Sequence, residues 1–212
     1  TFFRNNRIFD CLYSQQFDRA TLDTLIHLAD HMRAITKSKA GDDFLQSLLS
    51  HKRAMLYFSQ PSTRTFLSFM SACHILGIRV LEIRDLSTSS QVKGESLEDT
   101  IRTFSSYVDL IIMRHHLSGF AEKASWVVNN TNRPIPVINA GSGPDQHPTQ
   151  ALLDVYTIWK QKGSLENLHV AFGFDPLHSR TVRSLALILS HFKGNRFTFI
   201  SPPSLRAASA FL

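Results

Sequence analysis

Short apolar runs alternate with longer amphipathic or turn-rich stretches along this chain, and few folds are compatible with that order. The runs lie at about 54–58, 79–83, 108–113, 135–139, 168–174 and 196–200. A short apolar run that is bounded by turns and followed by a helix is typical of a strand buried on both faces of a parallel sheet. The alternation therefore predicts an α/β fold, in which helices cover parallel sheets on both faces.

Turn and helix signals divide the chain into two parts. Asn139 to Pro144 forms a turn cluster, Pro148 suits the first turn of a helix, and Gly163 stands where that helix should stop. We predict two doubly wound parallel-sheet domains joined by this helix. Residues 1–147 form the first domain, and residues 148–212 hold the connecting helix and part of the second. Two strands bury little surface, so we expect the second domain to be incomplete in this chain.

Composition narrows the class of protein. The 212 residues carry a formal net charge of +6, but Lys and Arg are scattered rather than clustered, which disfavours a nucleic-acid partner. A moderate positive charge also suits an enzyme that handles small anions. No apolar run is long enough to cross a bilayer, and the two cysteines, Cys11 and Cys73, indicate no disulfide framework. We therefore expect a cytoplasmic protein with no membrane partner.

The turn from Ser62 to Thr65 is the first candidate binding element. It follows the apolar run at 54–58 and opens a segment in which Phe66 and Phe69 recur at helical spacing. The free N–H groups of a first helical turn attract anions, and Arg64 adds a forked, charge-assisted donor. The alternative is that Ser62 only caps the helix while Arg64 faces solvent.

Four further polar groups follow successive apolar runs, where an open parallel sheet builds its binding crevice. Each alone has a simpler structural explanation, such as a solvated charge or a helix cap. Their joint occurrence after consecutive predicted strands is better explained by one shared site. They are Ser89 to Ser96, which includes Lys93, then Met113 to His115, Gln146 to Gln150, and Asp175 to Arg180.

Five motifs in order resemble the aspartate carbamoyltransferase family, and in particular its catalytic chain. They are FSQPSTRT, SSQVKGESLEDT, YVDLIIMRH, PVINAGSGPDQHPTQALLD and DPLHSRTVRSL. Ornithine carbamoyltransferases share the phosphate turn but typically have HPCQ where this chain has HPTQ at 147–150. They also lack the Arg-Thr-Val-x-Ser-Leu found from Arg180 to Leu185. The aspartate branch is therefore favoured.

The resemblance implies transfer of the carbamoyl group from carbamoyl phosphate to the amine of L-aspartate, in de novo pyrimidine biosynthesis. It implies that the phosphate is held by Ser62, Thr63, Arg64 and Thr65. It implies that the carbonyl oxygen is held by Thr65, Arg114 and His147, and that Gln150 accepts a hydrogen bond from the carbamoyl nitrogen. Arg64, Thr65, Arg114 and His147 are thus the predicted catalytic residues.

The resemblance also implies a homotrimer with shared active sites. Ser89 and Lys93 match the loop that a neighbouring subunit contributes, and Lys93 and Arg180 are the predicted aspartate-binding residues. The substrate amine is the nucleophile, so we expect no cofactor and no metal, and the sequence offers no metal-ligand cluster. The residues leave open whether a regulatory or dihydroorotase-like partner joins the assembly.

The chain departs from the family pattern at several positions. Gln60 stands where the family has a glutamate that helps hold two domains closed, and Phe174 replaces a common glycine. Phe66 and Met70 replace an arginine and a glutamate, and we expect them to form an apolar contact on one helix face. Leu177 and His178 replace the more usual lysine and tyrosine.

Two alternatives remain: a non-catalytic or structural paralogue in a pyrimidine-pathway assembly, and a carbamoyltransferase for another amine acceptor. A complete catalytic chain of the family is longer by roughly one domain. If these 212 residues were the whole protein, we would expect carbamoyl phosphate binding without efficient turnover.

Overall fold

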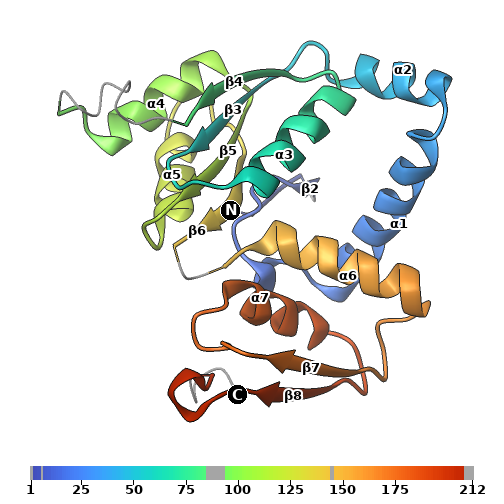
Figure 1. Cartoon of the computed structure of the whole chain (residues 1–212). Coiled ribbons are helices and arrows are strands. Elements are labelled where there is room, and N and C mark those ends of the chain that lie inside the picture. The colour runs from blue at the N-terminus through green and yellow to red at the C-terminus, as the bar shows by residue number, and fades with distance from the viewer. Residues whose placement is uncertain (1, 6, 85–93, 144–145, 208–212) are drawn as a thin grey trace. The chain divides into compact units, whose positions relative to one another are not determined.

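The computed structural model describes residues 2–5, 7–84, 94–143 and 146–207, and it has the α/β architecture with parallel sheets that the sequence predicts (Figure 1). Contacts group the chain into two compact units. The first holds Thr1–Leu12 and His31–Gly143, and the second holds Tyr13–Asp30 and Pro144–Leu212. Each unit consists of two separate segments of the sequence, whereas the sequence analysis predicts a single division after residue 147. The domain limits themselves stay a prediction.

The first unit is built on a four-stranded parallel sheet with strand order β4-β3-β5-β6. The strands are β3 (Arg53–Phe58), β4 (Arg79–Ile83), β5 (Leu110–His115) and β6 (Val137–Ser142). The connecting helices are α3 (Thr63–Ile75), α4 (Leu97–Tyr107) and α5 (Phe120–Asn129). All four strands fall on predicted apolar runs, with ends that differ by up to three residues.

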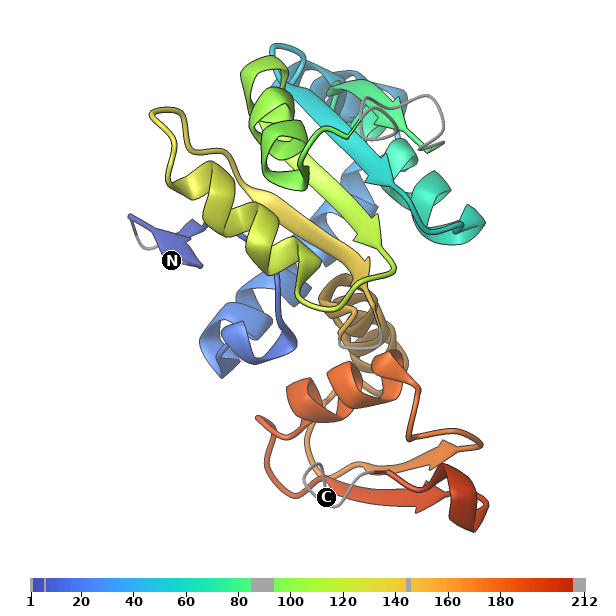
Figure 2. The same ribbon diagram turned by 90° about the vertical axis from the view of Figure 1, so that its left-hand side faces the viewer.

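Side chains of β3 alternate between two helical layers, as the period of a strand requires. Leu56 and Phe58 join a buried cluster with Phe66 and Cys73 of α3. Tyr57 points to the opposite face, where its ring centroid lies 5.5 Å from that of Phe104 in α4. Helix α3 thus covers one face of the sheet, and α4 and α5 cover the other (Figure 2).

The strand order places a switch point between β3 and β5. The chain leaves β3 for α3 on one face and leaves β5 for α5 on the other, although the two strands are hydrogen-bonded neighbours. Open α/β sheets bind their ligands beside the carboxyl ends of such a pair. The fold therefore marks this edge as the place for a site.

A buried carboxylate ties the N-terminal segment to the sheet. Cys11 bridges Ile138 in parallel, next to β6. Asp10 is 1% exposed; its Oδ1 accepts from the backbone N–H of Val137 at 2.8 Å, and its Oδ2 accepts from Ser125 and Asn129. Three donors on one carboxylate satisfy the buried charge, as burial demands.

Rings stack on the α5 side of the sheet. The His115 ring lies 3.6 Å from the Phe120 ring and nearly parallel to it, and the Tyr57 ring stacks on the same pair. Nδ1 of His115 accepts from the backbone N–H of Leu117 at 3.1 Å. Burial, together with the neighbouring His116, lowers the pKa of His115 to about 4. The ring is therefore neutral at physiological pH.

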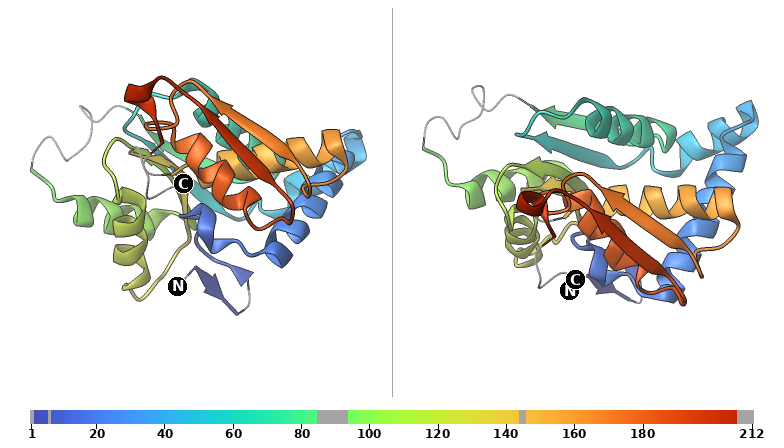
Figure 3. Two further views of the ribbon diagram at one scale, coloured as in Figure 1. Left: turned by 90° about the horizontal axis from the view of Figure 1, so that it is seen from below. Right: turned by 60° about the horizontal axis from the view of Figure 1, so that its bottom comes forward.

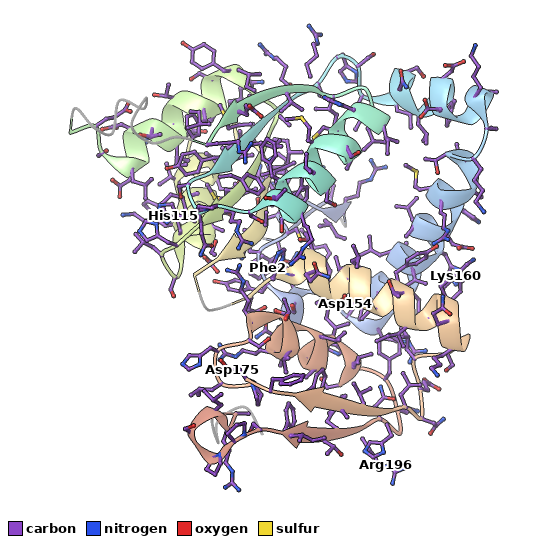
Figure 4. The ribbon with its side chains drawn as sticks, viewed as in Figure 1. Phe2, His115, Asp154, Lys160, Asp175 and Arg196 are labelled. Carbon is purple, nitrogen blue, oxygen red and sulfur yellow. The ribbon has the colours of Figure 1, made fainter. Side chains whose placement is uncertain are left out.

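The second unit contains a two-stranded parallel sheet and the helices packed with it. Its elements are η1 (Ser14–Gln16), the first part of α1 (Arg19–Ile35), α6 (Pro148–Lys162), β7 (His169–Gly173), α7 (Arg180–Leu189), β8 (Arg196–Ile200) and η4 (Pro203–Leu205). Strands β7 and β8 run side by side (Figure 3), and Asp175 and Arg196 mark opposite ends of this sheet (Figure 4).

Helix α6 has the predicted boundaries. Pro148 occupies its first turn, and Gly163 ends it in the left-handed conformation with φ +74° while its N–H donates to the carbonyl of Trp159. The side chains of Tyr156 and Lys160 both bond Asp30 of α1. These contacts fix α6 against the part of α1 that belongs to the same unit.

Some elements are absent from the sequence-based prediction. Helix α2 (Lys39–Leu48) and the hairpin of β1 (Phe3–Arg4) and β2 (Arg7–Ile8) were not expected. Helix α2 begins at Ser38, whose side chain accepts from the N–H of Gly41. Within the described ranges, no helix combines the length and apolar character that a membrane crossing requires.

We predict that Asp10→Ala lowers the free energy of unfolding by about 3 kcal/mol, because it leaves three buried donors without their acceptor. Asp10→Asn should cost less, since its carbonyl can still accept from Val137. Urea unfolding measures both, with the exposed Asp43→Ala as a control expected to change stability by less than about 0.5 kcal/mol. Equal stability of Asp10→Ala and the control would show that the network does not hold the N-terminal segment.

His115 also predicts a pH dependence of stability. The unfolded state takes up a proton near pH 6.5, whereas the folded state does so near pH 4, so the unfolding free energy falls as pH drops through this window. His115→Asn keeps an acceptor near the Leu117 N–H and cannot titrate. Wild type should lose about 2 kcal/mol more than this variant between pH 6.5 and 4. His51→Asn, at an exposed site, should instead follow wild type; parallel curves for all three proteins would contradict the assignment.

Candidate functional site

The turn between β3 and α3 leaves its polar groups available. Ser62 is the N-cap residue of α3, with extended backbone, but its hydroxyl does not accept the capping hydrogen bond. Among the residues that the structure describes, the side chains of Ser62, Thr63, Arg64 and Thr65 make no hydrogen bond or ion pair with one another or with other residues. Arg64 is exposed. The capping part of the alternative is therefore not seen, whereas Arg64 does face solvent, as that alternative expects. The hydroxyls, amides and guanidinium of this turn can all face an anion.

Arg114 lies at the carboxyl end of β5, beside this turn. It pairs with Phe58 in the β3–β5 register, and its carbonyl accepts from the backbone N–H of Ser59 at 3.1 Å. The turn from Ser62 to Thr65 and Arg114 thus belong to neighbouring strand ends of one unit, as the sequence analysis expects. Two of the predicted cations are brought to the same edge of the sheet.

A bulge in β6 holds the Arg114 side chain. Met113 pairs with Asn139 but His115 pairs with Ser142, so Ala140 and Gly141 together face Arg114. The Nη1 of Arg114 donates to the Ala140 carbonyl at 3.3 Å. Bulges commonly redirect side chains next to functional sites.

The residues of this bulge were expected to form a turn after residue 139, and that expectation is wrong. Strand β6 continues to Ser142. The Asn139 Oδ1 accepts from the N–H of Gly141 and from the hydroxyl of Ser142, so a side chain satisfies groups that the bulge removes from regular pairing. Gly141 has φ +110°, which a glycine adopts without strain.

The second unit contains His147, Gln150 and Arg180. His147 is the N-cap residue of α6 and is 5% exposed, and its backbone N–H donates to the buried Ser184 hydroxyl of α7 at 3.0 Å. Its Nδ1 lies 3.4 Å from the hydroxyl of Thr149. The start of α6 is thereby tied to α7, the helix that begins with Arg180.

Asp154 sets the orientation of the Gln150 amide. The Nε2 of Gln150 donates to the Asp154 Oδ1 at 2.9 Å, one helical turn away, and burial raises the pKa of the Asp154 carboxyl. With its donor end engaged, Gln150 presents its oxygen as an acceptor. This is the polarity that accepting from a carbamoyl N–H requires.

The loop after β7 carries the remaining predicted residues. Arg180 is half-buried, and burial lowers the pKa of its guanidinium. Asp175 accepts from the backbone N–H and the ring of His178, and these hydrogen bonds lower the pKa of Asp175. Phe174 is 89% exposed with φ +73°, a backbone conformation that favours glycine, which is the residue common in the family at this position.

Two of the other departures have local explanations. Phe66 is 5% exposed, and Met70 packs against the same cluster, so the expected apolar contact on α3 is confirmed. Gln60 is different: its Oε1 is buried and makes no hydrogen bond with the described residues. Nothing in the structure explains that substitution.

Ser89 and Lys93 lie outside the described residues. Within the described part of the chain, no three side chains of His, Cys, Asp or Glu gather as metal ligands would. Sequence reasoning missed Asp154 and Ser184. The spacing of Gln150 and Asp154, four apart on one helix, could have indicated the first; Ser184 needs the packing of α6 on α7.

The chain matches the family model described as "Aspartate/ornithine carbamoyltransferase, carbamoyl-P binding domain" over residues 10–160. Curated relatives include an Arabidopsis thaliana chloroplastic aspartate carbamoyltransferase, 47% identical over 91% of this chain and 47% of the relative. A Parabacteroides distasonis aspartate carbamoyltransferase catalytic subunit is 44% identical over 89% of this chain and 58% of the relative.

Solved structures give the same result. A Trypanosoma cruzi aspartate transcarbamoylase in complex with N-(phosphonacetyl)-L-aspartic acid matches with a TM-score of 0.87 and 35% identity, over 96% of this chain and 60% of that one. The catalytic subunit of M. jannaschii aspartate transcarbamoylase matches with a TM-score of 0.85 and 37% identity, over 96% and 64%. The chain spans about half the length of the curated relatives it matches. The predicted resemblance is confirmed, and the chain belongs to the aspartate/ornithine carbamoyltransferase family.

Proposed function

We propose that this chain binds carbamoyl phosphate and takes part in carbamoyl transfer to the amine of L-aspartate, which yields N-carbamoyl-L-aspartate and phosphate in pyrimidine biosynthesis. The observation that carries the proposal is the uncapped turn from Ser62 to Thr65 beside Arg114, at the switch point of the sheet. Related Trypanosoma cruzi structures are described as complexes with carbamoyl phosphate and aspartate, and with carbamoyl aspartate and phosphate.

The chemistry needs donors rather than a protein nucleophile. The amine nitrogen attacks the carbonyl carbon, the bond from that carbon to the phosphate oxygen breaks, and the amine loses a proton, for which the departing phosphate is an acceptor. Negative charge develops on the carbonyl oxygen and on the phosphate. Fixed hydrogen-bond donors that point at the carbonyl oxygen lower the activation barrier, by about 3–4 kcal/mol for each donor in comparable sites.

The residues divide this work by position. In the proposal, Ser62 to Thr65 hold the phosphate, and Thr65, Arg114 and His147 donate to the carbonyl oxygen. The Gln150 oxygen accepts from the carbamoyl nitrogen, for which its hydrogen bond to Asp154 prepares it. Arg180 holds an aspartate carboxylate.

Assembly and localisation are part of the same proposal. We propose a homotrimer in which Ser89 and Lys93 reach the neighbouring subunit's site, as the family motif implies, and leave a regulatory or dihydroorotase-like partner open. The free thiols of Cys11 and Cys73 are compatible with the cytoplasm, which we propose as the compartment. Plant relatives carry chloroplastic names.

A non-catalytic relative of the enzyme is the second candidate. Two observations favour it: the buried Oε1 of Gln60, which has no hydrogen-bond partner among the described residues, and the exposed, left-handed Phe174. A carbamoyl-aspartate assay on the protein, with ornithine and other amines as competing acceptors, separates it from the enzyme and from a transferase for another amine.

We predict that Arg64→Ala weakens the binding of inorganic phosphate at least ten-fold, because a forked charge-assisted pair is lost. Arg64→Lys should retain part of the affinity as a point charge. Titration calorimetry measures both, and Arg102→Ala, an exposed arginine of α4, is the control for net charge. If wild type binds phosphate and Arg64→Ala binds it equally well, the turn is not the anion site.

We further predict complementation between defective chains. Neither Arg64→Ala nor Lys93→Ala chains should bind N-(phosphonacetyl)-L-aspartic acid normally, because Arg64 is assigned to its phosphonate and Lys93 to its aspartate part. After dissociation, equal mixing and reassembly, roughly one site in four combines an intact Arg64 with an intact Lys93 from its neighbour. Calorimetric stoichiometry should recover by that fraction. Mixtures that bind no better than the separate variants would count against a shared site.

A further inference from the structure

Arg84 lies on an aromatic ring next to the proposed phosphate turn. Its guanidinium carbon is 4.2 Å from the centroid of the Phe66 ring. Arg84 directly follows β4, and Phe66 directly follows Thr65 in the first turns of α3. Two segments that are distant in sequence thus meet at one point of the first unit.

The Phe66 ring is a fixed support. It is 5% exposed, its centroid lies 5.3 Å from that of Phe58 in an edge-to-face contact, and it belongs to the buried cluster between β3 and α3. An arginine that stacks on such a ring is oriented by the cation–π attraction while its N–H donors, which lie in the guanidinium plane, stay available. The contact therefore directs the donors without consuming them.

Apart from this ring contact, no interaction of the Arg84 side chain is seen among the described residues. It is exposed, and it makes no hydrogen bond or ion pair with any residue in the described ranges. Among the described residues, no carboxylate forms an ion pair with Arg84. Here an apolar ring holds the cation in place.

Strand register puts Arg84 at the functional edge of the sheet. Ile83 pairs with Tyr57, so Arg84 stands level with Phe58, where β3 ends and the turn toward Ser62 begins. Each of three adjacent strands thus has an arginine at or after its carboxyl end. Arg84 follows β4, Arg64 lies in the turn after β3, and Arg114 lies at the end of β5.

We propose that Arg84, positioned by Phe66, is a third arginine of the phosphate site. It donates to a phosphate oxygen and balances the second negative charge of the dianion. The inference rests on the proposed function, because it assigns another residue to the same anion site. It concerns the residues by which this chain holds the phosphate group, not the carbonyl chemistry.

The test is phosphate titration of the full chain with Arg84→Ala and Arg84→Lys. Arg84→Ala should weaken phosphate binding about five-fold, and Arg84→Lys by less. Arg79→Ala is the matched control, since it removes the same charge from the other end of β4, where Arg79 donates to the Ser50 carbonyl. That control should bind phosphate as wild type does. Unchanged circular dichroism verifies that the exposed substitutions leave the fold intact.

A double-mutant cycle tests the role of the ring. Phe66→Leu keeps an apolar side chain in the cluster but removes the π face. In that background Arg84→Ala should weaken binding by no more than about two-fold, because the guanidinium is no longer directed. A full five-fold effect in the Phe66→Leu background would overturn the positioning by Phe66.

The outcomes separate this inference from the proposed function. Loss of binding in Arg64→Ala, with wild-type binding in Arg84→Ala, would overturn the third arginine and leave the site in place. Equal losses of phosphate affinity in Arg84→Ala and Arg79→Ala would mean that only the net charge matters, and would also overturn the third arginine. Absence of phosphate binding by wild type would overturn both.

Discussion

Parallel pairing of β3 with β4 on one side and β5 on the other is the constraint on which the first unit depends. Parallel neighbours all end at the same edge, so the residues that follow them meet there however far apart they are in sequence. Because α3 and α5 then leave on opposite faces, the ends of β3 and β5 are not covered by one crossover. The Ser62 turn and Arg114 occupy that position.

Local structural features then orient the side chains of the candidate site. The β6 bulge offers the Ala140 carbonyl to Arg114, and the side chains of the uncapped turn at the start of α3 make no hydrogen bond within the described part of the chain. In the second unit, the carboxylate of Asp154 fixes which end of the Gln150 amide is presented. Each of these features either interrupts regular hydrogen bonding or buries a charged group, and such unfavourable features are found mainly at functional sites.

The chain's departures from the family pattern fall into two kinds. Phe66 and Met70 are absorbed into a buried cluster, where Phe66 also supports a cation, so the first turns of α3 keep an arginine close by. Gln60 and Phe174 are not compensated in this way: the buried oxygen of Gln60 lacks a partner in the described ranges, and Phe174 has a left-handed backbone. The departures in the first turns of α3 are therefore accommodated by packing, and those at Gln60 and Phe174 are not.

The hydrophobic pattern and turn signals by themselves determined the α/β class, six of the strands, namely β3 to β8, and helix α6 with its Pro148 and Gly163 boundaries, since these depend on local sequence. The roles expected of the motif residues came from the family resemblance. Strand order, the β6 bulge, and the partners Ser184 and Arg84 were decided only by tertiary structure, whereas the four-residue spacing of Gln150 and Asp154 was already present in the sequence. Asn139 to Gly143 reads as a turn because glycines dominate it, yet pairing with β5 extends the strand to Ser142. Arg84 carries no sequence signal, because its place over Phe66 depends on which strand lies beside β3, a long-range choice that hydrophobic pattern does not encode.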